Sequence, residues 1–296
     1  MTGIIWLASY PKSGNTWFRL LVANLSATDK PTDINAMAER GGIASARGEF
    51  EFHTMLDSGL LTHDEADALR PRVYEVLTDD AEEEAEPETQ ARLVKAHDAY
   101  LMTSAGEPML RAAARAIVIV RDPRDVAASL ANHRRSTIDE AIAFMADRDA
   151  TFAANPRGQA LQLRQRLLDW SGHAASWLDQ ADIPTHLVRY EDLQADPVET
   201  FSAALAFAGR PAARADIERS IEFARFERLQ AQELERGFAE WRPRNTSALF
   251  FRRGQSQAWR SELTAEQVQC IESVHGSMMA RLGYPLAAEL GVRGAA

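Results

Sequence analysis

The residues best suited to chemistry stand near the N-terminus, between an apolar run at 4–8 and a helical pattern at 17–25. A strand, a tight loop and a helix in this order direct backbone N–H groups and the positive end of the helix dipole at one place. Lys12 adds a full positive charge there, and Ser13 and Thr16 add hydroxyl donors. The segment therefore predicts a binding corner for phosphate or a similarly shaped anion.

This loop differs from the phosphate loop of nucleoside triphosphatases. That loop has the form G-x-x-x-x-G-K-[ST], with Lys directly after its second glycine. Here Lys12 comes two residues before a single glycine, Gly14. The alternative to an anion site is an ordinary strand–helix turn with a solvated Lys12, so the rest of the chain must decide.

A second candidate anion site follows the apolar run 117–120. Arg121 stands at the tip of this predicted strand, and Ser129 lies about two helical turns later. A planar guanidinium group and a nearby hydroxyl can hold one phosphate between them. The alternative is an ordinary ion pair between Arg121 and Asp125 at a helix N-terminus.

Two further polar groups stand out, one in a loop and one at the end of a predicted strand. Arg252, Arg253 and Gly254 would gather guanidinium groups and free N–H donors in one loop. Lys95 and His97 stand at the end of another predicted strand, and His is the residue whose pKa suits proton removal near neutral pH. The alternative for His97 is a surface histidine without a catalytic role.

These segments resemble sulfotransferases that use 3′-phosphoadenosine 5′-phosphosulfate (PAPS), of the cytosolic type. Residues 10–17 are similar to the family's 5′-phosphosulfate loop, Y-P-K-S-G-[TN]-T-W. Residues 121–129 are similar to R-x-x-[RK]-D-x-x-x-S, and 95–97 to K-[TA]-H. Residues 250–259 resemble F-x-R-K-G-x-x-G-D-W, except that Arg replaces Lys and Gln-Ala replaces the later Gly-Asp. The resemblance extends over residues 6–283.

The resemblance implies transfer of a sulfuryl group from PAPS to a hydroxyl or amine of a small acceptor, with 3′,5′-adenosine bisphosphate (PAP) as product and no metal. His97 would be the general base in an in-line transfer, and Trp17, Phe226 and the Tyr190 of a Y-E-D-L segment would surround the adenine. The implied catalytic residues are His97, Lys12 and Lys95. The implied cofactor-binding residues are Pro11, Lys12, Ser13, Gly14, Asn15, Thr16, Trp17, Arg121, Ser129, Tyr190, Phe226, Arg252, Arg253 and Gly254.

Short β-rich runs alternate with helical patterns along the chain. This order predicts an α/β fold with a central parallel β-sheet flanked by helices, and ligands bound beyond the C-terminal ends of the strands. The resemblance makes this a P-loop-like sulfotransferase fold, with one domain over 1–296. The predicted strands are 4–9, 92–95, 117–120 and 186–189.

Residues 32–90 and 134–180 match no motif of the family, and we expect them to be insertions that form acceptor-side walls or a lid. The acidic run 79–88 is interpreted as a solvated surface loop. Two interpretations stay open for 241–244, a gate over the pocket and an ordinary surface loop.

Several helix ends are marked by capping residues. Asp122-Pro123 and Asp196-Pro197 each predict a helix start, and Thr264 with Gln267 forms a capping box. The helix after Thr264 is predicted to bury one apolar face, made of Val268, Ile271, Val274, Met278 and Leu282.

The composition of the chain limits the classes of partner and site that it can have. The chain has 296 residues, of which 46% are hydrophobic, which is enough for a sizeable core. A formal net charge of −10 disfavours nucleic acid or a long polyanion as partner. The single Cys270 excludes an internal disulfide and a multi-cysteine metal site.

The N-terminal apolar run is too short for a signal or membrane segment, so we expect a cytoplasmic protein. The oligomeric state is open, with a homodimer as one option.

Two other classes of function compete. A P-loop-type nucleotide kinase or NTPase needs a magnesium-binding carboxylate at a strand tip, where this chain has Arg121. A non-catalytic nucleotide-binding adapter would have no need of Lys12 or His97. Binding of PAP separates the sulfotransferase from the kinase.

Overall fold

The computed structural model describes residues 3–36, 42–83, 91–110, 113, 115–155, 161–241 and 249–290, without the side chains of 79–83. Residues 79–83 of the acidic run form the end of the helix His63–Glu83, so the interpretation as a loop is wrong there, and residues 84–88 lie outside the described residues. Of the candidate gate 241–244, residues 242–244 lie outside them.

Within the described residues, four parallel strands form the central sheet in the order β2-β1-β3-β6. Their bounds are β1 Ile4–Ser9, β2 Arg92–Ala96, β3 Arg115–Val120 and β6 Thr185–Arg189. All four predicted strands are confirmed, and three of them are one or two residues longer than predicted. In the central register, Leu7 of β1 is paired with Lys95 of β2 and with Ile117 of β3.

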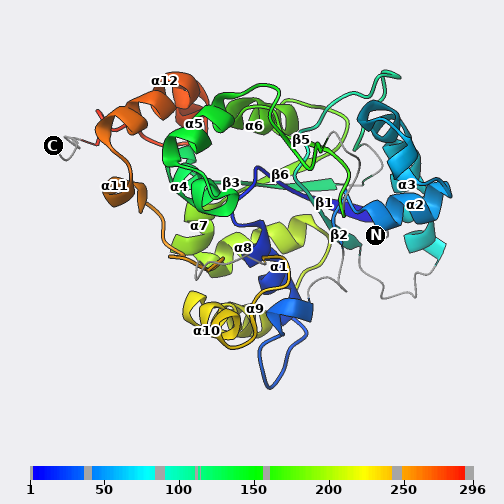
Figure 1. The fold of residues 1–296 in the computed structure, drawn as a ribbon. Coiled ribbons are helices and arrows are strands. Elements are labelled where there is room, and N and C mark those ends of the chain that lie inside the picture. The colour runs from blue at the N-terminus through cyan, green and yellow to red at the C-terminus, as the bar shows by residue number, and fades with distance from the viewer. Residues whose placement is uncertain are drawn as a thin grey trace.

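Helices cover both faces of this sheet (Figure 1). On one face lie α3 (His63–Glu83), α4 (Pro123–Arg134), α5 (Ile138–Ala146), α6 (Trp170–Leu178) and α12 (Ala265–Arg281). On the other lie α1 (Asn15–Asn24), α8 (Pro197–Phe207), α9 (Arg214–Phe223) and α10 (Phe226–Arg236). Successive residues of β1 point to opposite faces, so Trp6 belongs to the first core cluster and Leu7 to the second. The predicted α/β fold is confirmed.

The remaining elements connect these layers. They are α2 (Arg47–Thr54), the 3-10 helix η2 (Ser58–Leu60), the antiparallel pair β4 (Thr151–Phe152) and β5 (Gln165–Arg166), α7 (Tyr190–Ala195) and α11 (Trp259–Glu262).

The predicted helix starts are confirmed. The carboxylates of Asp122 and Asp196 accept hydrogen bonds from backbone N–H groups of α4 and α8, and Thr264 forms its capping box with Gln267. The predicted apolar face of α12 is partly wrong, because Val274 is 52% exposed. The buried position is taken by His275, whose Nδ1 lies 2.9 Å from Ser171 Oγ, and this hydrogen bond lets a polar ring sit in the core.

Parallel strands bring the functional candidates to one edge. β1 runs into the loop that contains Lys12, β2 ends just before His97, β3 ends just before Arg121, and β6 runs into Tyr190. Because all four strands point the same way, these residues lie at the same edge of the sheet.

Candidate active site

A cavity of about 1130 Å³ lies at the C-terminal edge of the sheet. Its lining includes every predicted site residue except Ser13, whose side chain is fully buried. The catalytic candidates Lys12, Lys95 and His97 therefore share one space with the cofactor-binding candidates.

The loop before α1 has a restricted backbone and gives the helix no side-chain cap. Gly14 is the N-cap of α1 with φ 106°, and no side chain caps the helix, so the amides of its first turn lack helical partners. A Cβ at Gly14 would lie 2.6 Å from Tyr190 Cδ2, so this position requires glycine. Asn15 Nδ2 donates to Leu7 O at 2.9 Å and to Ser9 Oγ at 3.2 Å, which ties the helix start to the end of β1.

Lys12 lies close to two other positively charged side chains of the cavity, those of Lys95 and Arg121. It adopts φ 71°, and its Nζ lies 3.6 Å from the centre of the Phe250 ring. Burial, followed by the charges of Lys95 and Arg121, lowers the pKa of Lys12 to about 7. The Phe250 ring favours the ammonium and opposes that shift. Lys12 is therefore poised to gain a proton when an anion binds.

Arg121 connects the loop before α1 with the loop after Phe251. Its Nη2 donates to Gln255 O at 2.9 Å and its Nη1 to Lys12 O at 3.5 Å, and its guanidinium carbon lies 4.3 Å from the centre of the Tyr190 ring. The Asp125 carboxylate is engaged elsewhere, accepting from the backbone N–H groups of Gln257 at 2.8 Å and Trp259 at 2.9 Å. The alternative of a simple Arg121–Asp125 ion pair is therefore not what the structure contains.

The loop after Phe251 is held in a restricted conformation. Gly254 has φ 60°, and a Cβ there would lie 2.1 Å from Phe226 Cδ2, so the loop backbone rests directly on the Phe226 ring. Gln257, at the position of the family's second glycine, also has a positive φ of 62°. The Asp125 carboxylate that accepts from its N–H helps to hold this unfavourable backbone.

An acidic residue that sequence reasoning missed orients the two arginines. Glu262 of α11 accepts from Arg252 Nη1 at 2.8 Å and Nη2 at 2.7 Å, and it pairs with Arg253 Nε at 2.8 Å. Glu262 lines the cavity, about ten residues beyond the loop in sequence. A bidentate carboxylate holds guanidinium groups in a defined plane.

Aromatic rings border the same part of the cavity. Trp17 Nε1 donates to Ala224 O at 3.1 Å, and the Trp17 and Tyr190 rings meet edge to face with centroids 5.5 Å apart. Phe226, at the start of α10, lies under Gly254. These rings can surround a flat heterocycle.

His97 is held as a neutral base. Its Nδ1 lies 2.8 Å from the carbonyl oxygen of Ser9, which can only accept, so Nδ1 carries the proton and Nε2 has a free lone pair. Burial, followed by the Lys95 charge, keeps the pKa of His97 well below its usual value. The ring is thus unprotonated at neutral pH, as a general base must be.

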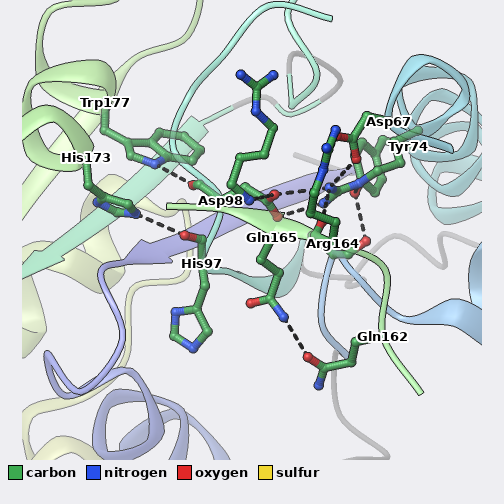
Figure 2. Close-up of polar contacts among 12 residues, drawn as sticks. Asp67, Tyr74, His97, Asp98, Gln162, Arg164, Gln165, His173 and Trp177 are labelled. Carbon is green, nitrogen blue, oxygen red and sulfur yellow. Dashed lines mark hydrogen bonds and ion pairs between the residues drawn. The ribbon is translucent and has the colours of Figure 1, made fainter. Parts of the chain in front are cut away.

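Two aromatic side chains of α6 fix the backbone that carries this histidine (Figure 2). His173 Nε2 lies 3.1 Å from His97 O, and Trp177 Nε1 donates to Asp98 O at 3.0 Å. The carbonyl groups of His97 and Asp98 are therefore both anchored.

The Asp98 side chain forms a buried ion pair that sequence reasoning missed (Figure 2). Arg70 of α3 donates to Asp98 Oδ2 at 2.7 Å and Oδ1 at 3.1 Å, and neither side chain is exposed to solvent. Arg70 also donates to Tyr74 Oη at 2.7 Å and to Arg164 O at 3.0 Å. Such a pair is stable only when its hydrogen bonds are all satisfied, and here it joins the 32–90 and 134–180 segments to the end of β2.

Lys95 also has a partner that lacked any sequence signal. Glu240 accepts from Arg19 Nη1 at 2.7 Å and lies 3.5 Å from Lys95 Nζ. Burial lowers the pKa of Lys95, and the Glu240 charge partly opposes this shift. By contrast, His133 could have been found, because it follows Ser129 by four residues and so shares its helix face.

No group of three or more His, Cys, Asp or Glu side chains among the described residues is placed to hold a metal ion. No described helix combines the length and apolar character that crossing a bilayer requires.

Known proteins resemble the chain in sequence pattern and in fold. No match was found among curated proteins. The fold is similar to mouse sulfotransferase SULT7A1 complexed with PAP, at 18% identity over 98% of this chain and 88% of that chain, with a TM-score of 0.60. It is also similar to retinol dehydratase in complex with retinol and PAP, at 20% identity over 93% of this chain and 81% of that chain, with a TM-score of 0.57. A second retinol dehydratase structure, with androsterone and inactive cofactor PAP, gives 20% identity, 93% and 80% coverage and a TM-score of 0.57.

The structural neighbours show a shared fold, whereas a match to a protein family over most of the chain shows membership of that family. Residues 3–283 match the sulfotransferase domain, which is nearly the whole chain and includes the loop before α1, His97, Arg121 and the loop after Phe251. The chain therefore belongs to the sulfotransferase domain family.

Proposed function

We propose that the protein transfers the sulfuryl group of PAPS to a hydroxyl or amine of a small-molecule acceptor and releases PAP. The observation that carries this proposal is a single cavity in which an uncapped helix N-terminus with Lys12 meets the neutral imidazole of His97. An anion cradle next to an unprotonated base suits a reaction that removes a proton while charge grows on a leaving phosphate. The kinase and adapter alternatives are not favoured.

The donor end of the cavity fits PAPS. Ser13 Oγ and Arg121 Nε are buried without a hydrogen-bond partner among the described residues, as expected of groups that await an anion. The loop before α1 would hold the 5′-phosphosulfate, and Arg121, Ser129 and the 252–254 loop would hold the 3′-phosphate. Trp17, Tyr190 and Phe226 would enclose the adenine. Crystals of the solved neighbours contain PAP, which supports the same donor here.

PAPS supplies the sulfuryl group when bound, and this chain's residues handle the charge and the proton. His97 Nε2 takes the proton from the acceptor hydroxyl or amine. Lys12 and the free amides of the first turn of α1 neutralise charge that develops on the leaving phosphate oxygens. Lys95, positioned by Glu240, would contact the sulfuryl oxygens.

The acceptor end would be formed by the two segments without family motifs. Residues of both segments line the cavity, among them Ala46 and Glu49 of the first, and Phe152 and Gln162 of the second. Their position supports an acceptor-side role for 32–90 and 134–180. The two retinol dehydratase structures contain androsterone or retinol, which supports a small-molecule acceptor here. The net charge still disfavours a polyanion, and a cytoplasmic location stays a prediction from the sequence.

Calorimetry with PAP tests the proposed function directly. We expect a one-to-one complex, and we expect ATP with Mg²⁺ to bind far more weakly and PAPS to compete with PAP. Labelled PAPS with a panel of alcohols, phenols and amines should then yield a sulfated product. Tight binding of Mg²⁺–ATP without any binding of PAP would overturn the proposal in favour of a kinase.

Gly254→Ala is expected to weaken PAP binding by at least about 10-fold, because the new methyl group would collide with the Phe226 ring and displace the 252–254 loop. The matched control is Gly106→Ala, where φ is +79° but no atom lies within 4 Å of the added Cβ. Both variants carry similar backbone strain, so calorimetry isolates the effect of the collision. An equal loss of PAP affinity in both variants would contradict a role for the loop in binding.

A further inference from the structure

Two buried polar atoms on the acceptor side of the cavity have no hydrogen-bond partner among the described residues. They are Gln165 Oε1 and His133 Nδ1. Gln165 is only 2% exposed, yet both residues line the cavity. The proposed transfer uses neither of them, so the structure contains polar groups at the site that still require an explanation.

The amide of Gln165 is held in a defined orientation. Its Nε2 donates to Gln162 Oε1 at 2.6 Å, and its backbone pairs with Phe152 across the β4–β5 ladder. Figure 2 shows the Gln165 amide and the His97 imidazole pointing the same way, each from the end of its own strand. Nε2 donates one hydrogen bond to Gln162, whereas the carbonyl oxygen is the atom of this amide that has no partner among the described residues.

A buried carbonyl oxygen without a donor is unfavourable, because it has lost its hydrogen bonds to water and received none in return. Native structures satisfy nearly all such groups with protein, water or ligand. Gln165 Oε1 can only accept, so the group that satisfies it must present an O–H or an N–H.

His133 adds a second polar atom beside an aromatic wall. Its ring stacks on Trp241 with centroids 5.0 Å apart and an interplanar angle of 26°, and it lies 6.1 Å from the Phe152 ring. Nδ1 can accept or donate, depending on the tautomer. The acceptor side thus combines flat apolar surface with two hydrogen-bonding atoms.

We propose that Gln165 Oε1 accepts a hydrogen bond from a second hydroxyl or amino group of the acceptor, one that is not sulfated. The enzyme would then select polyhydroxylated or amino-hydroxylated compounds over otherwise equal molecules with a single donor. This inference rests on the proposed sulfotransferase function, because it requires an acceptor that delivers its reacting group to His97.

Matched acceptors test this selection. An aromatic series pairs catechol, resorcinol and hydroquinone with their monomethyl ethers, which keep the shape but lack the second donor. An alicyclic series pairs the cyclohexanediols with the methoxycyclohexanols, and comparison of the two series separates phenolic from aliphatic acceptors. In at least one pair, wild-type kcat/KM for the diol should exceed that for the ether by at least about 10-fold.

Gln165→Leu should abolish that preference, whereas Gln165→Glu, which keeps an acceptor oxygen, should retain it. Gln194→Leu is the matched control, because Gln194 Nε2 donates to Gly254 O at 2.5 Å in the donor-side loop. This variant should weaken PAP binding and leave the diol-to-ether ratio intact. Melting temperatures check that each variant is folded.

The outcomes of these experiments separate the inference about Gln165 from the proposed function. A diol preference that survives in Gln165→Leu overturns the inference, as does a wild-type enzyme that treats diols and ethers alike. If no pair is turned over, binding of the same pairs to the PAP complex is measured by calorimetry, and equal or absent binding also overturns it. Failure to bind PAP would instead overturn the proposed function, and this is read independently of any acceptor.

Discussion

Lys12→Met is expected to lower the rate of sulfuryl transfer by about 100- to 1000-fold, the loss typical of removing one preorganised charge from a transition state. Met keeps most of the length of the side chain and can still pack against the Phe250 ring, although it lacks the Nζ that contacts this ring, so the fold should survive. Single-turnover kinetics with labelled PAPS measure the rate, and calorimetry measures the smaller loss of PAP affinity. Because Lys12 meets growing charge, its effect should fall mainly on the chemical step.

Lys30→Met is the control for this experiment. Lys30 is exposed on a loop and does not line the cavity, so its removal changes the formal net charge equally without touching the site. The proposed role of Lys12 would be wrong if both variants retained full turnover. It would also be wrong if Lys12→Met lost PAP binding completely while the rate from bound PAPS stayed normal.

The pH dependence of PAP binding should report the same lysine. Without ligand the pKa of Lys12 is lowered to about 7, and a bound anion raises it, so between pH 7 and 9 binding takes up a proton. PAP affinity should therefore fall as pH rises through this window, by up to about 10-fold per pH unit. Lys12→Met should flatten the dependence. Calorimetry in buffers of different ionisation enthalpy detects the proton directly.

His97→Asn should lower kcat by about 100- to 10,000-fold with little change in PAP affinity. The Asn amide can still donate to Ser9 O in place of Nδ1, whereas the free Nε2 that takes the proton is removed. Steady-state kinetics and PAP calorimetry separate the two effects. His186→Asn is the control, because His186 stacks on Phe207 with ring centroids 5.2 Å apart and does not line the cavity.

The wild-type pH profile gives a second check on this base. Burial and the Lys95 charge hold the pKa of His97 well below its usual value, so its neutral form persists below pH 6.5. The acid limb of kcat/KM, which reports groups of the free enzyme, should therefore lie below pH 6.5. A limb at or above that pH, or normal kcat in His97→Asn, would assign the base to another group.

Much of the fold was predictable because its signals are local. The strand at Ile4–Ser9, the loop with Lys12 and the start of α4 at Asp122-Pro123 each depend on neighbouring residues, and each was found. The face of α12 was partly mistaken, since the buried His275 depends on Ser171, about a hundred residues away. A polar residue in a helix core has no local signal when its partner is distant.

The candidate site likewise has one part that the sequence predicts and another that depends on the packing of distant elements. The sequence alone determined which segments could bind an anion and, through the parallel order of its strands, that Lys12, His97 and Arg121 would meet at one edge. Only the tertiary structure decided what surrounds them: Glu262 on the arginines, Glu240 on Lys95, and Gln165 with its unpartnered oxygen. None of these residues belongs to a motif of the family. Their positions depend on how distant elements pack, and spacing along the chain carries no record of that packing.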